Sequence, residues 1–456
     1  MWSSLLRRRT YLLDAVRTRL WPLPVMAIVA AIAAGVLLPR LDEARDSTLR
    51  PALGGFLFGG GPAAARELLS AIAGSLVTVT SLTFSLTVVT LQLASSQFSP
   101  RLLRTFARDR FVQSTLGLFL ATFVYAITVL RTVRDDSGDG GFVPRISVTV
   151  SYLLVLASVI GLILFLAHLV REIRVESMIY TVRTDAVETA RTSFDELDEL
   201  DDETGGPLPD PPPTATALHA CSTGFLVALD HAALTAAASG CDAVILVDVM
   251  PGEWMVTGSP VAFAWPAEEA RQLDDDQFDT LRRCLASAIT TGDERTPVQD
   301  VGYGLRQLTD VAVKALSPGI NDPTTAIHVL DHSASLLCEL VVRRLGSTAL
   351  CDDDGVVRVV VRRPDLAALL ELAIGQPRHY GAAEVAVLSR LLWLLREVGW
   401  RSRRDEDNAV ILGQLHRVQA TAAAQDFDAA DRERLERLVS DVHDALAGRW
   451  RPSDRG

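Results

Sequence analysis

The sequence predicts an integral membrane α-helical part with four spans, followed by a cytoplasmic α+β domain that is mostly helical. The first observation is composition: 49% of the 456 residues are hydrophobic, yet 22% are charged. A chain of this size with both properties is best explained by a membrane part joined to a water-exposed part. The second is a series of long uncharged runs, all before residue 171, and the third is a change to short apolar runs after it. The formal net charge of −12 argues against a nucleic-acid partner.

Four apolar segments are long enough to cross the hydrocarbon core, which takes about 20 residues in a helix. They cover 21–38, a long helix that starts at Pro62, 111–130 and 147–170. We expect a cytoplasmic N-terminal arm (1–20), a four-helix transmembrane domain (21–170), a helix with an acidic and proline-rich linker (171–214), a small α/β or β-rich subdomain (215–265) and a helical cytoplasmic domain (266–450).

Arginines flank the spans unequally. The N-terminal arm holds five and the loop between the second and third spans holds four. Because positive residues gather on the inner side, this bias predicts both termini in the cytoplasm. All five cysteines follow the last span and match neither a zinc pattern nor CxxC, as expected for reduced thiols in the cytosol.

The second span is the most informative stretch. No ionisable residue lies between Glu67 and Arg101, yet the run is rich in hydroxyl and amide side chains. Helical spacing places one set on a shared face: Gly74, Thr78, Ser81, Ser85 and Gln92. A second line is predicted to run beside it: Thr80, Thr83, Thr87, Thr90 and Ala94.

Two interpretations of these side chains remain open. The hydroxyls can bond back to the carbonyl four residues earlier while small residues pack against neighbouring helices. Alternatively, Thr78, Ser81, Ser85 and Gln92 face water in a pore that several subunits build, because a polar stripe in a membrane must face protein or water.

The part after the linker alternates apolar runs and turns before it becomes helical. Strands are predicted at 223–229, 243–249 and 254–261, with a helix at 230–239 and with Trp254 and Trp265 in the core. Helices are predicted at 267–291, 305–315, 323–345, 364–375, 382–400 and 429–447, with a stray strand at 358–361.

One segment, from Asp293 to His332, stands out. Its centre is a corner in which Asp322 is placed as a helix N-cap and Pro323 as the first helical residue. The remaining corner residues that we single out are Ser317, Gly319, Asn321, Thr324 and Thr325. The corner is either a capped helix–turn–helix element or a binding site for an anion or polar metabolite, since helix N-termini attract anions.

His328, Asp331 and His332 follow at positions i, i+3 and i+4 of the next helix. This spacing can hold a metal, but no fourth ligand is evident, so we expect a solvated or packing face and no metal. No GxSxG, P-loop, GxGxxG or HExxH motif is present. We therefore expect no cofactor and no catalytic residue, which disfavours a membrane-bound hydrolase.

Two motifs resemble a known family. TSLTFSLTVVTLQLASSQFSPRLLRTFARDR and GLRQLTDVAVKALSPGINDPTTAIHVLD are similar to the DUF2254 family of bacterial predicted membrane proteins. The resemblance implies an inner-membrane protein with a cytoplasmic C-terminal region and supplies no substrate. From the residues themselves we expect a homo-oligomeric ion channel or channel-like transporter for an unidentified ion or polar ligand. The alternative is a membrane-anchored sensor or scaffold without transport.

Overall fold

The computed structural model describes residues 21–45, 57–97, 109–134, 142–172, 174–197, 208–268 and 272–451. The chain forms two compact units, Met1–Arg174 and Val175–Gly456, which are described separately below. Three predicted features lie outside the described residues. They are the N-terminal arm, most of the acidic linker, and most of the arginines from which the orientation of the termini was predicted.

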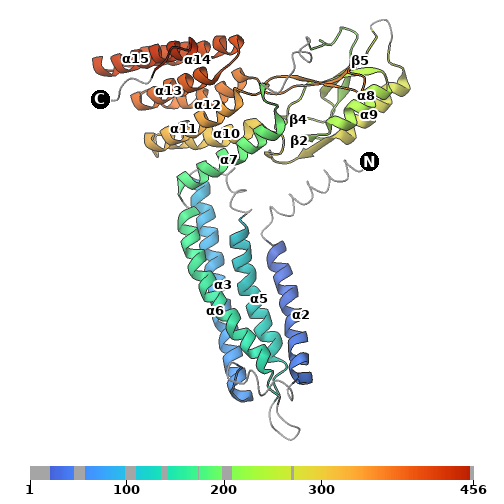
Figure 1. Ribbon diagram of the computed structural model, residues 1–456, viewed down its shortest axis with the longest axis vertical. Coiled ribbons are helices and arrows are strands. Elements are labelled where there is room, and N and C mark those ends of the chain that lie inside the picture. The colour runs from blue at the N-terminus through green and yellow to red at the C-terminus, as the bar shows by residue number, and fades with distance from the viewer. Residues whose placement is uncertain are drawn as a thin grey trace. The chain divides into compact units, whose positions relative to one another are not determined.

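The first unit is a bundle of helices that run alongside one another (Figure 1). They are α2 (Pro22–Arg45), α3 (Pro62–Gln97), α5 (Arg110–Leu130) and α6 (Arg145–Glu172). Each is long and apolar enough to cross a membrane. The predicted four-span architecture is therefore confirmed, and α3 begins at the predicted Pro62.

Helix α5 is the centre of this bundle, since it packs on α2, α3 and α6 more extensively than any of the other three helices does on its neighbours. Glycines allow the close approach of α2 and α5: a Cβ atom at Gly35 would lie 2.9 Å from the Thr128 side chain. Phe119 and Tyr125 of α5 are buried at the centre of the apolar core. By contrast, α6 is mostly exposed, with Ile163 62% exposed, as expected for a helix that faces lipid.

Carboxylates join the helices at both ends of the bundle. At one end Asp42 of α2 accepts hydrogen bonds from the backbone of Ile146 and Ser147, at 3.1 and 3.0 Å, and from the Ser147 hydroxyl at 3.0 Å. These groups belong to the first turn of α6, where a carboxylate satisfies free N–H groups and interacts well with the helix dipole. At the other end Asp109, the N-cap of α5, pairs with His168 of α6. The contacts fix α6 at both of its ends.

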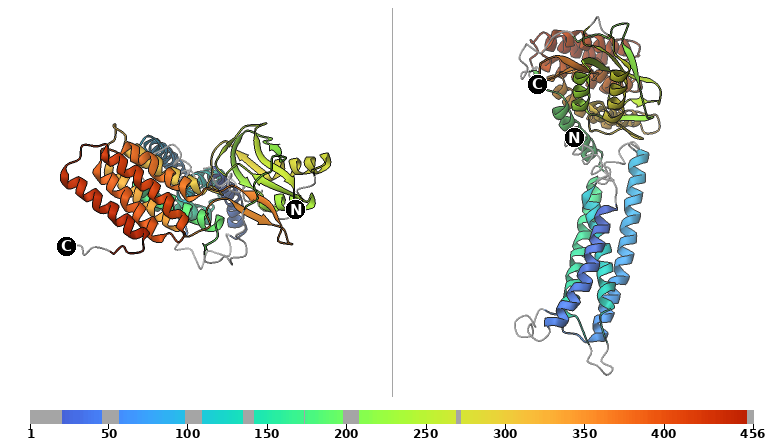
Figure 2. Two further views of the ribbon diagram at one scale, coloured as in Figure 1. Left: turned by 90° about the horizontal axis from the view of Figure 1, so that it is seen from above. Right: turned by 90° about the vertical axis from the view of Figure 1, so that its right-hand side faces the viewer.

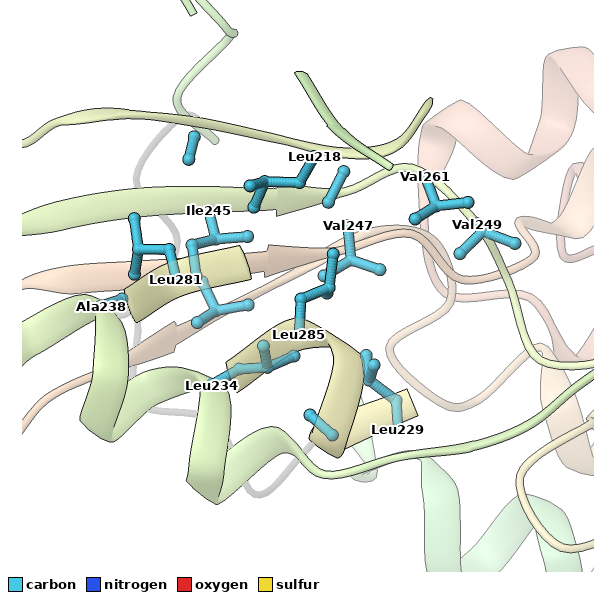
Figure 3. Packing of buried hydrophobic residues seen from close by; sticks show 14 of the residues in the cluster. Leu218, Leu229, Leu234, Ala238, Ile245, Val247, Val249, Val261, Leu281 and Leu285 are labelled. Carbon is cyan, nitrogen blue, oxygen red and sulfur yellow. The ribbon is translucent and has the colours of Figure 1, made fainter. Parts of the chain in front are cut away.

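The second unit contains a five-stranded sheet in the order β1-β5-β3-β8-β7. Its strands are β1 (Thr216–His219), β5 (Pro260–Pro266), β3 (Ala243–Val247), β8 (Val357–Val361) and β7 (Thr348–Cys351). Only the β3–β8 pairing in this sheet is parallel, with Ile245 opposite Val359. Helices α8 (His231–Gly240) and α9 (Asp275–Ala288) contact its strands, and their leucines complete the apolar core (Figure 3).

This arrangement corrects the predicted boundary between a subdomain at 215–265 and a helical domain at 266–450. The core of the sheet includes Leu281 and Leu285 of α9 together with Val359 and Val361 of β8. The strand predicted at 358–361 is thus not stray: β8 lies inside the sheet, between β3 and β7. The physical reason is that β3 pairs with a segment more than 100 residues away, which no local pattern reveals.

A second, three-stranded sheet has the order β4-β2-β6, with β4 (Trp254–Met255), β2 (Gly224–Leu229) and β6 (Ile289–Gly292). The prediction that Trp265 lies in the core is confirmed, but the same prediction for Trp254 is wrong. Trp254 is 53% exposed and its ring stacks edge-on against Phe225, at 4.8 Å between centroids.

The remaining helices stack on one another in successive tiers (Figure 1). They are α7 (Val175–Ser193), α10 (Val301–Ala315), α11 (Pro323–Leu340), α12 (Leu366–Tyr380), α13 (Val385–Arg401), α14 (Asp405–Ala423) and α15 (Ala429–Leu446). Helix α7 lies at one end of the stack, and α14 and α15 lie at the other. Helix α14 was not predicted from the sequence. Gly304 of α10 lies so close to α7 that a Cβ atom there would be 2.4 Å from the Ala186 Cβ.

Candidate functional site

Helix α3 carries the predicted site. It packs through its first half, where Leu69, Ile72 and Leu76 are buried among the bundle residues. Figure 2 (right) shows α3, in light blue, at the edge of the bundle. In its second half most side chains are exposed, and the segment up to Leu93 remains apolar enough for a span.

The two hydroxyl lines of α3 lie on opposite faces rather than side by side. Thr83, Thr87 and Thr90 are buried within the unit. The members of the other line are exposed: Gly74, Thr78, Ser81, Ser85 and Gln92. We call this second set the outer polar face. With 3.6 residues per turn the mean directions of the two lines are roughly 180° apart, which corrects the expected neighbouring arrangement.

The buried line is satisfied within the helix. The hydroxyls of Thr83, Thr87 and Thr90 each donate to the carbonyl four residues earlier, at 2.8 Å. Their hydrogen-bonding groups therefore need neither water nor a partner helix. On the outer polar face the Thr78 hydroxyl reaches the Gly74 carbonyl only at 3.4 Å.

The outer polar face has the periodicity of a helix–helix contact. Together with the apolar Val88, which lies on the same side, its residues at positions 74, 78, 81, 85 and 92 follow alternating steps of four and three. Such 3.5-residue spacing is that of the residues that meet in left-handed helix pairs. In a membrane, small and hydroxyl residues at these positions allow close approach, and an amide such as that of Gln92 hydrogen-bonds across helices. The face is suited to contact other helices rather than lipid.

The corner between α10 and α11 is a capped turn. Asp322 accepts from the Thr325 backbone at 3.1 Å and from its hydroxyl at 2.6 Å, and these bonds lower the pKa of the Asp322 carboxyl. Asn321 has φ +49°, a left-handed conformation that Asn tolerates better than most residues. The Ser317 hydroxyl donates to the Lys314 carbonyl at 2.6 Å.

Gly319 and Thr324 of this corner are exposed. The local hydrogen bonds engage the polar groups of Ser317, Asp322 and Thr325, so capping explains these residues without a ligand. Whether the corner also binds one stays a prediction.

The cluster on α11 has partners from neighbouring helices that spacing alone did not reveal. Asp331 forms an ion pair with Arg390 of α13 at 3.0 Å. Burial lowers the pKa of His332, and the nearby charge of Arg183 on α7 lowers it further. Among the described residues, no group of three or more His, Cys, Asp or Glu side chains is arranged to hold a metal ion.

Sequence reasoning also missed a buried pair in the segment from Asp293 to His332. Arg295 and Asp300 lie 2.7 Å apart, and the Asp300 side chain is only 5% exposed. The turn at Gly252 (φ +88°) packs directly on this pair, because a Cβ atom there would overlap the Asp300 carboxylate at 2.0 Å. The available signal was an acidic residue just before a helix, which local reasoning interprets as an ordinary cap.

Comparison with known proteins places the chain in a family. The family model described as "Predicted membrane protein (DUF2254)" matches residues 17–397. Uncharacterized proteins of Mycobacterium bovis (strain ATCC BAA-935 / AF2122/97) and Mycobacterium tuberculosis (strain ATCC 25618 / H37Rv) are each 34% identical over 432 residues. Those alignments cover 94% of this chain and 81% of each relative. No solved structure matches significantly. With its four long apolar helices, the chain is a membrane protein and belongs to the DUF2254 family.

Proposed function

We propose that the protein is a homo-oligomeric ion channel or channel-like transporter of the bacterial inner membrane, not an enzyme, with α3 lining the pathway. The observation that carries the proposal is the outward position of Thr78, Ser81, Ser85 and Gln92, opposite the face that packs in the bundle. A polar stripe that points away from its own bundle needs protein or water beside it. A ring of α3 helices from several copies supplies both.

The second unit would then mediate assembly or gating from the cytoplasm. An even number of spans returns the chain to the side on which it entered, which agrees with both termini being cytoplasmic. All five cysteines belong to this unit, which supports a reducing compartment for it because their spacing suggests no disulfide framework. The face carries no ionised side chain, so hydroxyl and amide dipoles would select the permeating species.

Ion flux through proteoliposomes tests this function. Wild type should conduct, and Ser81→Leu should reduce the flux strongly, because it replaces a small hydroxyl of the pathway by a bulky apolar group. Ala157→Leu on the exposed side of α6 is the matched control and should conduct normally. Absence of flux in all three proteins, or equal flux in all three, would contradict the proposed pathway.

Cysteine accessibility gives an independent measurement in a background with the five native cysteines replaced by serine. Cysteines at Thr78, Ser81 and Ser85 should react with a membrane-impermeant thiol reagent. A cysteine at Ile163, an exposed apolar position of α6, should not react. Protection of all three α3 positions would favour a membrane-anchored sensor or scaffold in which α3 only packs. The self-satisfied hydroxyls of Thr83, Thr87 and Thr90 support that packing role for the opposite face.

A further inference from the structure

We propose that the face shared by α7 and α11 binds a phosphate-bearing anion through Arg183, His328, His332 and Ser335. Helix α11 contacts both α7 and α13. Three residues at i, i+4 and i+7, namely His328, His332 and Ser335, line one side of α11. Arg183 of α7 donates to Ser335, and its charge acts on His332. The proposal is independent of the proposed pathway in α3.

In the part of the chain that the structure describes, the Arg183 guanidinium contacts a hydroxyl and an aromatic ring and forms no ion pair. Its Nη1 donates to the Ser335 hydroxyl at 3.4 Å, and its Cζ lies 5.3 Å from the centre of the Tyr180 ring. Stacking on an aromatic ring restricts an arginine while its N–H edges stay available. Arg183 thus offers several oriented donors beside a neutral hydroxyl.

Asp331 is the acidic residue within the cluster, and a second arginine compensates its charge. Arg390 of α13 pairs with Asp331 at 3.0 Å and lies over the Trp393 ring at 4.9 Å. Among the described residues no ion pair joins Arg183 to a carboxylate, and its charge acts on the neighbouring imidazole of His332. The lowered pKa of His332, caused by burial and by Arg183, agrees with a site of positive potential.

The donors favour phosphate over a carboxylate. Ring N–H groups, a hydroxyl and a guanidinium come from two helices and so approach from different directions. Within the described chain, His332 Nδ1 is buried and has no hydrogen-bond partner. A proton on Nδ1 would therefore have no acceptor, so the neutral ring is expected to carry its proton on Nε2, which then acts as a donor. A tetrahedral phosphate accepts from several directions, whereas a carboxylate accepts near one plane.

The phosphate can belong to a lipid headgroup or to a free phosphate compound. The fourth span, α6, ends at Glu172, and α7 begins three residues later at Val175. Lipid headgroups are therefore one source of the phosphate. Basic and aromatic residues that follow a span commonly interact with anionic lipid. The two sources share the same chemistry at Arg183 and need separate measurements.

In the first arm, inorganic phosphate is titrated into the detergent-purified full-length protein at constant ionic strength, and calorimetry measures the binding. The second arm compares hydrogen exchange of α7 and α11 in nanodiscs of phosphatidylglycerol and of phosphatidylcholine. Arg183→Gln should weaken binding at least about tenfold, as expected for the loss of a charge-assisted hydrogen bond. Arg191→Gln, which removes the same charge from a 60% exposed position of α7, is the control and should change little.

Asp331→Asn provides a variant with the opposite expected effect. It removes the negative charge and frees Arg390, so binding should become several-fold tighter, whereas a purely structural cluster would show no gain. Phosphate binding in the first arm identifies a free ligand, and protection only with phosphatidylglycerol identifies a headgroup. Equal losses in Arg183→Gln and Arg191→Gln, or no response in either arm, would overturn the proposal.

Discussion

The buried carboxylate of Asp300 makes a quantitative prediction about stability. Burial raises the pKa of Asp300 to about 6, although the adjacent Arg295 acts to lower it. Each pKa unit corresponds to 1.36 kcal/mol, so the difference from the ordinary value of 3.8 corresponds to about 3 kcal/mol. Because the pKa is raised in the folded state, the protonated Asp300 carboxyl contributes this free energy to folding. The contribution is fully present below pH 3.8 and is lost as the pH rises through about 6.

The variant Asp300→Asn keeps the shape of the side chain and removes its titration. Linkage predicts that the stability difference between variant and wild type changes by about 2 kcal/mol between pH 4.5 and 7.5, in favour of the variant at high pH. The altered contact with Arg295 adds an offset that is independent of pH, so the slope is the informative quantity. The expected sign is opposite to that of an aspartate stabilised by an ion pair.

Hydrogen exchange of the α10 amides in the full-length protein measures the opening free energy as a function of pH. Asp353→Asn, at an exposed loop position, serves as the control for removal of a carboxylate and should run parallel to wild type. If Asp300→Asn also runs parallel to wild type, the carboxylate does not titrate as its burial implies. A difference that changes in the opposite direction would show that Arg295 dominates over burial.

Two further predictions concern packing and capping. Both are tested by the midpoint of thermal unfolding in detergent. Gly304→Val should lower stability by about 1–3 kcal/mol because its side chain overlaps Ala186, whereas Gly413→Ala, in open space on α14, should raise it by about 0.5–1 kcal/mol. Asp42→Ala should cost about 1–3 kcal/mol or more by leaving buried N–H groups of α6 unpaired. An unchanged midpoint for Gly304→Val or Asp42→Ala would refute the corresponding contact.

Much of the element content could be predicted locally. The four spans follow from runs of apolar residues, and α8 (His231–Gly240) was predicted at 230–239, within a residue of its bounds. The corner at Asp322 was predicted from its capping residues, Asp322 and Pro323. Capping and hydrophobic runs are properties of neighbouring residues, so they are visible without a fold.

Other features depend on residues that are distant in sequence. The parallel pairing of β3 with β8, the exposed position of Trp254 and the ion pair between Asp331 and Arg390 have no local signature. The same holds for the hydrogen bonds that Asp42 accepts from α6, which lies more than 100 residues further along the chain. Helical spacing therefore placed the outer polar face on one helix, whereas Arg183 and Arg390 beside His332 and Asp331 of α11 were not predicted.

The sequence alone determined that hydroxyl side chains occur at helical spacing in an uncharged span, because a 3.6-residue period is read directly from order along the chain. Only the tertiary structure decided which hydroxyl line is buried, since burial depends on where α5 packs. That packing turns Thr83, Thr87 and Thr90 inward and leaves Thr78, Ser81, Ser85 and Gln92 outward. Which groups remain available to a partner follows from this choice of face.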